Sequence, residues 1–465
     1  MVSGSAVCMA ASQNRTTPEA GGASLPASQS GGSEGASMVT SVPHISQHRS
    51  ALTDLPALRL RRREERRILA GHLWVFSNEV DTSRTPLTAF EPGDAVRVEA
   101  SDGRPLGTGY VNPRSLICAR LLSRDPRVMP DGDLVRERVT NALRLRERLF
   151  PEPFYRAVYG DGDFVSGLVV DRFGDHLVVQ VTTAGMERLL PAALEAMRDA
   201  FRPAGILLRN DSRGRELEGL DRYVRVLEGD VPDEVEIVEN GVRFLAPLAG
   251  GQKTGWFYDH RPNRARLARY VARGGRVLDL FGYVGGWGVQ AAVAGASEVV
   301  CVDRSAAALE TATRNAELNG VGDRFRTVEG DAFQVLEDLA ASGERFDVVV
   351  ADPPALIPRR RDRKAGERAY GRLNRLAFSV LDADGILVSA SCSYHLPRDR
   401  HRDILRREGL NAAVDLRILE EGGQGPDHPV HPAIPETEYL TCVTASVSPA
   451  VRSRSQETTN DVGTD

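Results

Sequence analysis

The sequence predicts an α/β protein whose C-terminal half folds around an open parallel sheet, and three apolar runs predict this class. The first, Val277–Leu280, leads through a glycine-rich turn into an alanine-rich helix. The second, Glu298–Asp303, follows about twenty residues later, and the third is Phe346–Ala351. Short continuous apolar runs of this kind are typical of parallel strands that are buried on both faces.

Length and composition indicate a soluble protein of several domains. The chain has 465 residues, enough for two or three domains, and 41% of them are hydrophobic. It contains no apolar run of about eighteen residues, and its N-terminus lacks a basic segment followed by an apolar stretch. We therefore expect no membrane span, no signal peptide and a cytoplasmic location.

The cysteine count and the charge distribution bear on disulfides, metal sites and nucleic-acid binding. The five cysteines are scattered and odd in number, which argues against a disulfide framework or a zinc site, and we expect no metal. The net charge of −5 gives no global nucleic-acid signature. Two stretches, Arg59–Arg67 and Arg359–Lys364, are nevertheless strongly basic. Each can be a solvated helix face or a phosphate-binding surface, and the position of the second, just after Asp352-Pro353-Pro354, favours contact with substrate.

Both ends of the chain are expected to be disordered. Residues 1–52 are rich in Ser, Gly, Ala and Thr, and residues 449–465 are rich in Ser, Thr and charge. Met38 is an alternative to Met1 as the start of the chain.

Residues 53–127 are expected to form a small β-barrel, because short strands alternate with glycine-rich turns. The predicted strands lie within Gly71–Phe76, Gly93–Val98, Gly103–Tyr110 and Ile117–Leu122, after a basic helical opening. Through Gly-His-Leu-Trp-Val-Phe and Gly-Asp-x-Val-x-Val this stretch resembles a PUA domain, an RNA-binding barrel. The alternative is a barrel that only packs against its neighbour.

Residues 128–250 are expected to form a central α+β domain. Apolar residues at helical spacing predict an amphipathic helix over Asp131–Phe150. A β-β-α-β-β pattern follows, with strands at Gly167–Phe173, Leu177–Thr182, Gly205–Arg209 and Val235–Glu239 and a helix at Met186–Phe201. No catalytic constellation is evident there, so the domain is expected to brace its neighbour and shape a cleft.

Residues 251–448 carry the candidate chemistry. Asp303, Asp331 and Asp352 each follow a predicted strand, after the glycine-rich turn Phe281–Gly288. Open α/β sheets bind ligands at the carboxyl ends of their strands, so these acids predict a ligand crevice, although glycines after a strand can also form only a tight turn.

These motifs resemble those of class I S-adenosylmethionine-dependent methyltransferases. Three further motifs extend the resemblance: Tyr-Gly-Asp-Gly-Asp at 159–163, Gly-Gln-Lys-Thr-Gly-x-Phe at 251–257 and Asp-Pro-Pro at 352–354. With them, residues 53–448 resemble the ribosomal RNA large-subunit methyltransferase I type, which are 23S rRNA cytosine-5 methyltransferases with a PUA domain, a central domain and a C-terminal Rossmann-like methyltransferase domain.

The resemblance implies S-adenosylmethionine as cofactor and 23S rRNA as partner, without a membrane, and a homodimer is compatible with it. The expected cofactor residues are Phe281, Gly285, Gly286, Gly288, Asp303, Asp331, Ala332 and Asp352. The expected substrate residues are Pro353, Pro354, Lys253 and Arg261.

The predicted strand Ile386–Ser393 carries Cys392 near its end. A lone cysteine at such a place is usually a small buried hydrophobe. Cys392 follows the strand after the one that bears Asp352, and the resemblance makes it the nucleophile. A thiolate that adds to C6 of cytosine makes C5 nucleophilic enough to take a methyl group, and Asp352 is expected to bind the Watson–Crick edge of the base.

A base must then remove the C5 proton. Pro-Glu-x-x-Tyr-Leu resembles a late motif of the family and favours Glu436 over Glu438, although a solvated carboxylate is an equal alternative. Ala355 stands where enzymes that methylate amino groups usually carry an aromatic residue, which favours methylation of carbon.

Two other functions remain open from the sequence. One is methylation of another rRNA base, guanine or adenine, for which Cys392 would be dispensable. The other is a non-catalytic RNA-binding or ribosome-assembly protein.

Overall fold

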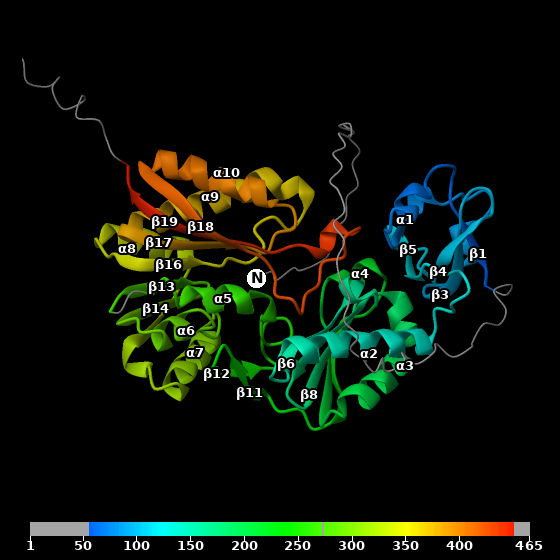
Figure 1. Ribbon diagram of the computed structural model, residues 1–465, viewed down its shortest axis with the longest axis horizontal. Coiled ribbons are helices and arrows are strands. Elements are labelled where there is room, and N and C mark those ends of the chain that lie inside the picture. The colour runs from blue at the N-terminus through cyan, green and yellow to red at the C-terminus, as the bar shows by residue number, and fades with distance from the viewer. Residues whose placement is uncertain (1–54, 272–273, 451–465) are drawn as a thin grey trace, which may run out of the picture.

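The computed structural model describes residues 55–450 except 272–273. The expected disordered segment 1–52, most of the expected tail 449–465 and Met38 lie outside the described residues. Three larger sheets follow one another along the chain (Figure 1). Among the described residues, no helix combines the length and the hydropathy that crossing a membrane requires.

The N-terminal sheet has five strands in the order β1-β3-β4-β5-β2. Its strands are β1 (Ala57–Arg59), β2 (Trp74–Phe76), β3 (Asp94–Glu99), β4 (Pro105–Val111) and β5 (Ile117–Ser123). A bridge between Leu60 and Val80 joins the chain after β1 to the chain after β2, and so links the two edges of the sheet. All four predicted strands are present, but the basic opening contains only one helical turn, α1 (Arg66–Leu69).

The central sheet has five strands in the order β10-β9-β8-β7-β6. They are β6 (Phe154–Tyr159), β7 (Leu168–Phe173), β8 (His176–Val181), β9 (Gly205–Asn210) and β10 (Tyr223–Gly229). Two helices pack together beside the sheet, α2 (Gly132–Leu149) and α3 (Ala184–Phe201). The predicted helix over Asp131–Phe150 is confirmed, and Asp131 caps it by accepting hydrogen bonds from the amides of Asp133 and Leu134.

The predicted strand Val235–Glu239 exists as β11 (Glu234–Glu239), but it does not join the central sheet. It pairs only with β12 (Val242–Pro247), and β10 takes the edge position of the central sheet instead. The Leu245 amide donates to Asn315 Oδ1 at 2.7 Å. The hairpin therefore packs on the C-terminal part of the molecule, although the expected domain boundary lies at residue 250.

The C-terminal sheet has seven strands in the order β15-β14-β13-β16-β17-β19-β18. The five parallel strands are β13 (Arg276–Leu280), β14 (Glu298–Asp303), β15 (Phe325–Glu329), β16 (Phe346–Ala351) and β17 (Leu381–Ser391), all at or near their predicted positions. Two strands that the sequence analysis does not anticipate, β18 (Val414–Gly422) and β19 (Thr441–Pro449), extend the sheet in antiparallel fashion.

Helices cover both faces of this sheet (Figure 1). One face carries α5 (Arg261–Leu267), α6 (Gly288–Val293) and α7 (Ala306–Leu318); the other carries α8 (Ala332–Ala341), α9 (Arg363–Val380) and α10 (Arg398–Asn411). Alternate residues of β13 explain the two layers, since Val277 packs with the first set and Leu278 with the second. Strand order reverses between β13 and β16, which is where such sheets bind ligands.

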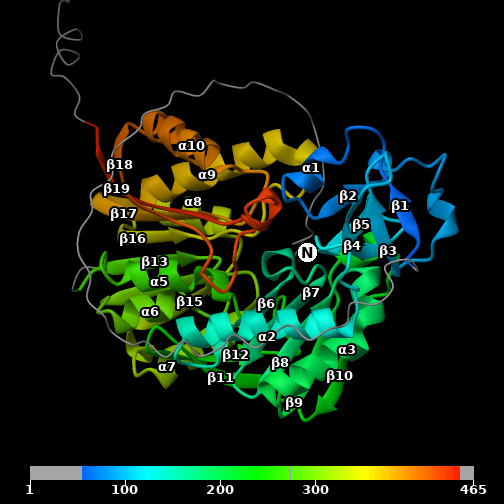
Figure 2. The same cartoon turned by 45° about the vertical axis from the view of Figure 1, so that its right-hand side comes forward.

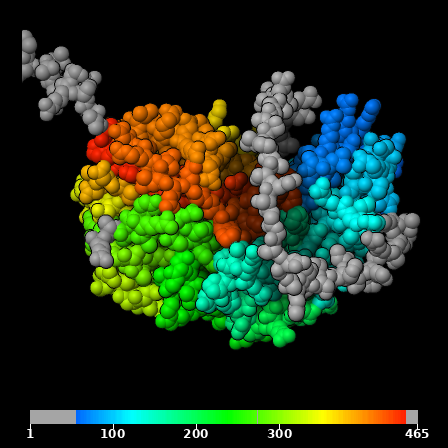
Figure 3. Space-filling model, viewed as in Figure 1, coloured from blue at the N-terminus to red at the C-terminus, as the bar shows by residue number. Residues whose placement is uncertain are grey.

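The segment between β18 and β19 connects the C-terminal part to the rest of the molecule. Ile434, which is fully buried, belongs to the hydrophobic core of the N-terminal sheet. Asp427 accepts hydrogen bonds from the central part through its backbone carbonyl, from Arg146 at 2.8 Å, and through its carboxylate, from the Arg156 amide at 3.1 Å. The orange-to-red segment accordingly reaches from the C-terminal sheet toward the blue and green parts in both ribbon views (Figures 1 and 2). In the space-filling view its dark red atoms lie beside blue-green ones (Figure 3).

Candidate active site

The turn between β13 and α6 is built on a buried carboxylate. Asp279 Oδ2 accepts a hydrogen bond from the Gly288 amide at 2.9 Å, while Asp279 Oδ1 is buried without a partner. Burial raises the pKa of Asp279 to about 7, and the carboxylates of Asp352 and Asp303 add to the shift. A Cβ atom on Gly282 would lie 2.3 Å from Cys301 Sγ, so only glycine allows the turn to close over Asp279.

Two non-glycine residues of this turn adopt left-handed backbone conformations. Phe281 has φ of 62° and Tyr283 has φ of 50°, which costs roughly 1–3 kcal/mol each. Several contacts hold Tyr283 in place. Its amide donates to Asp303 Oδ2 at 3.0 Å, and its hydroxyl accepts from the Gln252 amide at 3.0 Å. The loop Gly251–Phe257 is thus fastened to the turn.

The other predicted cofactor acids lie along the same edge of the sheet. Asp303 follows β14 and also accepts from the Ser305 amide at 2.9 Å. Asp331 caps α8 through the amides of Phe333 and Gln334 and forms an ion pair with Arg304. Ala332 is buried at the start of α8.

At the predicted glycines, the position that a Cβ atom would occupy points into the protein interior. A Cβ atom on Gly285 would touch Val289 and Ala312, and one on Gly286 would touch Arg264. A Cβ atom on Gly288 would lie 3.0 Å from Asp279 Oδ2. These glycines therefore allow close packing, and a bound ligand would meet their backbone atoms.

Asp352 lies at the end of β16 between two aromatic partners. Trp287 Nε1 donates to Asp352 Oδ2 at 3.0 Å, and His260 Nε2 lies 3.3 Å from Asp352 Oδ1. Burial disfavours the ionised carboxylate, but His260 and the indole N–H outweigh it and hold the pKa of Asp352 below its ordinary value. Asp352 is therefore an ionised hydrogen-bond acceptor whose side chain is still 20% exposed.

Cys392 follows β17, the strand beside β16. The two strands are in parallel register, with Ala351 opposite Ser389, so the residues after both strands meet at one edge. Cys392 is half-buried, and its Sγ lies 3.8 Å from the carbonyl oxygen of Pro353. Burial raises the pKa of Cys392 to about 11; Lys253 opposes this shift and Asp352 adds to it.

Cys392 lines a cavity of about 230 Å³. Lys253, Ala355 and Glu436 line the same cavity, as does Trp74 of the N-terminal sheet, whose indole N–H donates to Asp161 Oδ1 at 3.1 Å. Residues from all three larger sheets or their loops therefore enclose this space, which we call the Cys392 cavity.

Hydroxyl groups hold the end of β17 in place. Tyr370 OH lies 2.9 Å from both Ser391 Oγ and Ser393 Oγ, one on either side of Cys392. Ser393 Oγ also accepts from the Ile357 amide at 3.1 Å, in the loop that follows Pro353 and Pro354. This buried network fixes Cys392 relative to that loop.

The two candidate bases have different surroundings. Glu436 lines the Cys392 cavity, and its buried Oε2 has no hydrogen-bond partner among residues 55–450 as described. Glu438 is exposed and lies 3.8 Å from Arg398. Beneath them Tyr439 OH donates to Asp259 Oδ2 at 2.5 Å. Burial opposes ionisation of Asp259, but His428 and His260 hold its pKa far below the ordinary value.

The structure separates the expected substrate residues. Lys253 lines the Cys392 cavity, and Pro353 contributes the carbonyl oxygen near Cys392. Pro354 is exposed in the same loop. Arg261 points elsewhere: it donates to the Phe154 carbonyl and lies over the Phe150 ring at 4.5 Å. Its guanidinium joins the central and C-terminal parts and does not line the cavity.

Sequence reasoning missed three side chains that shape this site, His260, Trp287 and Trp74. Trp287 and Trp74 lie in motifs that it did single out, Phe281–Gly288 and Gly71–Phe76, but nothing in the sequence pairs Trp287 or His260 with Asp352. Among the described residues, no group of three or more His, Cys, Asp or Glu side chains is arranged to hold a metal ion.

Comparison with known families identifies two regions of the chain. Residues 58–124 match the model of a PUA-like domain, and residues 191–434 match that of an S-adenosylmethionine-dependent methyltransferase. Ribosomal RNA large subunit methyltransferase I of Aeromonas salmonicida (strain A449) is 35% identical over 382 residues, which cover 81% of this chain and 95% of that protein. The enzyme of the same name from Shewanella denitrificans is 34% identical over 84% of this chain and 99% of that protein.

Solved structures share the fold. A protein from Streptococcus mutans described as an S-adenosylmethionine-dependent methyltransferase superposes with a TM-score of 0.71 at 19% identity, covering 84% of this chain and all of that one. A crystal structure described as a methyltransferase complexed with SAH gives a TM-score of 0.73 at 19% identity over the same shares.

Proposed function

The chain belongs to the S-adenosylmethionine-dependent methyltransferase family that includes the ribosomal RNA large subunit methyltransferases I, and from this premise we propose that it methylates C5 of a cytosine in 23S rRNA. The observation that carries the proposal is the half-buried thiol of Cys392 in a cavity that it shares with Lys253 and Glu436. Methylation of an amino group needs no such thiol.

The residues along the carboxyl edge of the C-terminal sheet fit S-adenosylmethionine. Asp303 uses each carboxylate oxygen once for a backbone amide and keeps lone pairs for ribose hydroxyls. Phe281, on the same turn as Tyr283, adds a partly buried apolar side chain. When bound there, S-adenosylmethionine supplies an electrophilic methyl group.

We assign the covalent step to Cys392. Its thiol first gives up its proton to solvent, and the Lys253 ammonium favours the resulting thiolate. Sγ then forms a bond to C6 of the cytosine, and the electron pair of the C5–C6 double bond moves to C5. This pair forms the bond from C5 to the methyl carbon while the bond from that carbon to the sulfonium sulfur breaks and leaves its electron pair on the sulfur.

Release of the product needs a proton acceptor, and we assign this role to Glu436. Its buried, unpartnered oxygen supports the assignment. Removal of the C5 proton restores the C5–C6 double bond, and the C6–Sγ electron pair returns to sulfur. Asp352, held ionised by His260 and Trp287, accepts a hydrogen bond from the N4 amino group of the base in this scheme.

The test is to incubate the protein with labelled S-adenosylmethionine and unmodified 23S rRNA, digest the RNA and identify the labelled nucleoside by mass spectrometry. Labelled 5-methylcytidine is the expected result. Labelled guanosine or adenosine would retain the fold and the cofactor but refute the covalent mechanism. Absence of label from both rRNA and ribosomal particles would favour a non-catalytic RNA-binding protein.

A further inference from the structure

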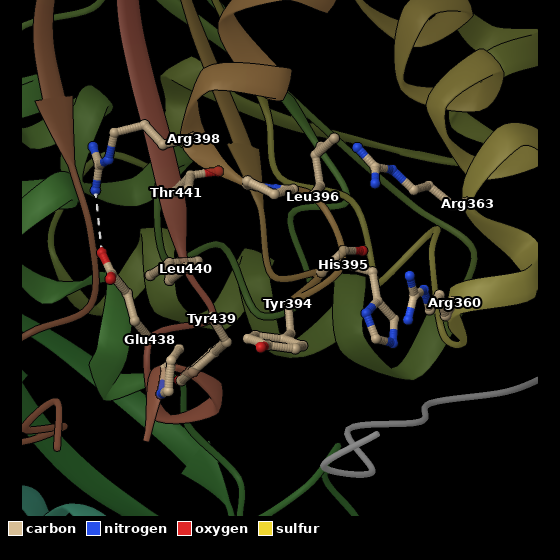
Figure 4. A pocket seen from close by; sticks show the side chains of 13 residues that line it. Arg360, Arg363, Tyr394, His395, Leu396, Arg398, Glu438, Tyr439, Leu440 and Thr441 are labelled. Atoms are coloured by element: carbon tan, nitrogen blue, oxygen red, sulfur yellow. Dashed lines mark ion pairs between the residues drawn. The ribbon is translucent and has the colours of Figure 1, made fainter. Parts of the chain in front are cut away.

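A second cavity, of about 450 Å³, adjoins the Cys392 cavity. The two share Ser393, Tyr394, His395 and Tyr439, so one wall separates them. We call the second one the arginine cavity, because Arg360, Arg363 and Arg398 line it (Figure 4). Arg360 and Arg363 belong to the basic stretch Arg359–Lys364, whose position in the sequence favours contact with substrate.

The arginine cavity has an excess of positive charge. Arg360 lies in the single turn Arg360–Asp362, and Arg363 and Arg398 begin α9 and α10. Glu438 is the one acidic residue of its lining and lies 3.8 Å from Arg398. Arg363 pairs with Glu367 outside the lining at 2.8 Å, whereas Arg360 forms no ion pair within the described part of the chain. Arg360 therefore keeps all its donors for a ligand.

Aromatic rings form the wall between the cavities. The rings of Tyr394 and His395 lie 5.3 Å apart at an angle of 58°. Figure 4 shows the His395 ring beside Arg360, with Tyr394 facing the centre of the cavity. Burial lowers the pKa of His395, and Arg360 and Arg363 lower it further, so the ring is neutral at neutral pH. Its Nε2 is buried without a hydrogen-bond partner.

We propose that the arginine cavity holds the nucleotide that flanks the target base in a single-stranded segment of the RNA substrate. Arg360 and Arg363 bind its phosphate, and its base lies against Tyr394 and His395. Grooves for single-stranded nucleic acid combine cations for the backbone with aromatic rings for the bases in this way. Because the two cavities share a wall, nucleotides that are consecutive in the RNA can occupy them together. This inference rests on the proposed function only in taking RNA as the substrate.

The test compares two double variants with the same loss of charge. Arg360→Ala/Arg363→Ala removes two arginines from the cavity, and Arg359→Ala/Arg361→Ala removes two exposed neighbours that do not line it. The probe is a fluorescein-labelled oligocytidine RNA of about sixteen nucleotides, titrated at several salt concentrations. Calorimetry with S-adenosylmethionine checks that both variants keep a folded cofactor site.

The first variant should bind the RNA about ten times more weakly than wild type, and the negative slope of log affinity against log salt should become shallower by about 0.7 for the lost phosphate contact. The second variant should keep the wild-type slope. Tyr394→Leu should weaken binding without changing the slope, because it removes stacking and no charge. Equal losses in the two double variants, or no loss in the first, would overturn the proposal.

The RNA-binding test of the arginine cavity and the labelling test of the methylated base can fail independently. If wild type labels guanosine while the variants behave as expected, the arginine cavity is correct and the cytosine mechanism is wrong. If wild type forms 5-methylcytidine while both double variants bind the RNA equally, the cytosine mechanism is correct and the arginine-cavity proposal is wrong.

Discussion

Cys392 and Cys442 lie at the same edge of one sheet but in different surroundings. Cys442 is buried opposite Ala390 in the pair β17–β19, whereas Cys392 lines a cavity. Only the second position lets a thiol reach a substrate. The pair therefore offers a matched test of the assigned nucleophile.

Cys392→Ala should abolish methyl transfer to rRNA and leave the affinity for S-adenosylmethionine nearly unchanged, because Cys392 lines a cavity that none of the expected cofactor residues lines. Cys442→Ala should retain transfer. Transfer assays and titration calorimetry on the two proteins check this. Full transfer by Cys392→Ala would refute its role as nucleophile.

Asp303→Ala should have the opposite effect and weaken cofactor binding by roughly 1–3 kcal/mol, since it removes a half-buried hydrogen-bond acceptor. It also frees the Tyr283 amide. Asp303→Asn is the control, because its amide oxygen can still accept from Tyr283. A smaller loss of affinity in the asparagine variant, measured by calorimetry, is expected; unchanged affinity in both would remove Asp303 from the cofactor site.

Asp279 should make stability depend on pH. Its pKa in the folded protein, about 7, exceeds that of an unfolded chain, so the folded state binds the extra proton. The protonated carboxyl stabilises the folded state fully below the pKa of the unfolded chain, and this stabilisation is lost as pH rises through about 7. Because each unit of pKa difference corresponds to about 1.4 kcal/mol, the total is a few kcal/mol.

Asp279→Asn, which keeps an acceptor for the Gly288 amide, should flatten this dependence. Thermal unfolding of both proteins between pH 5 and pH 8 measures this dependence. The stability of the variant relative to wild type should increase as pH rises. Parallel curves would show that Asp279 is ionised throughout.

At the scale of elements, the loop that carries Glu436 depends on the N-terminal sheet. Ile434, two residues earlier, is buried in the core of that sheet. Ile434→Ala should cost about 2–5 kcal/mol of stability and lower turnover, because the loop loses its anchor. Cofactor affinity should not change.

Ile237→Ala is the matched control. Ile237 is equally buried but lies in β11, away from the loop. It should lose similar stability in thermal unfolding and keep the wild-type turnover. Equal turnover in both variants would show that the anchor does not position Glu436.

Burial separates the strands that sequence reasoning predicted from two edge strands that it missed, β10 and β18. Strand β19, which it also missed, is mostly buried but mixes Thr and Ser with its apolar residues. The strands β13, β14 and β16 are almost wholly buried, and their continuous apolar runs are visible in the sequence. Edge strands β10 and β18 are largely exposed and carry no such pattern. The edge position of a strand depends on pairing with distant residues, which local pattern does not encode.

The same limit applies to the site. The acids after successive strands could be predicted, because parallel topology brings strand ends together whatever the side chains. The contacts of Trp74 with Asp161 and of His260 with Asp352 could not, since they depend on how separate parts of the chain pack.

At the scale of the whole molecule, three parts of the chain meet around one cavity. The C-terminal sheet contributes Cys392, the loop between β18 and β19 contributes Glu436, and the N-terminal sheet contributes Trp74. The predicted cofactor residues end or follow β13, β14, β15 and β16 along the carboxyl edge of the C-terminal sheet, and none of them lines the Cys392 cavity. This arrangement suits an enzyme that binds RNA with one part and presents a single base to another.

The most direct test of the covalent mechanism is to trap the adduct. RNA transcribed with 5-fluorocytidine in place of cytidine carries fluorine where the base must remove a proton, so the methylated adduct cannot break down. In the presence of S-adenosylmethionine, wild type should form a complex that survives denaturing electrophoresis, and peptide mass spectrometry should locate the nucleotide on Cys392. An adduct in Cys392→Ala, an adduct on another residue, or no adduct from protein that forms 5-methylcytidine on ordinary RNA would contradict the mechanism.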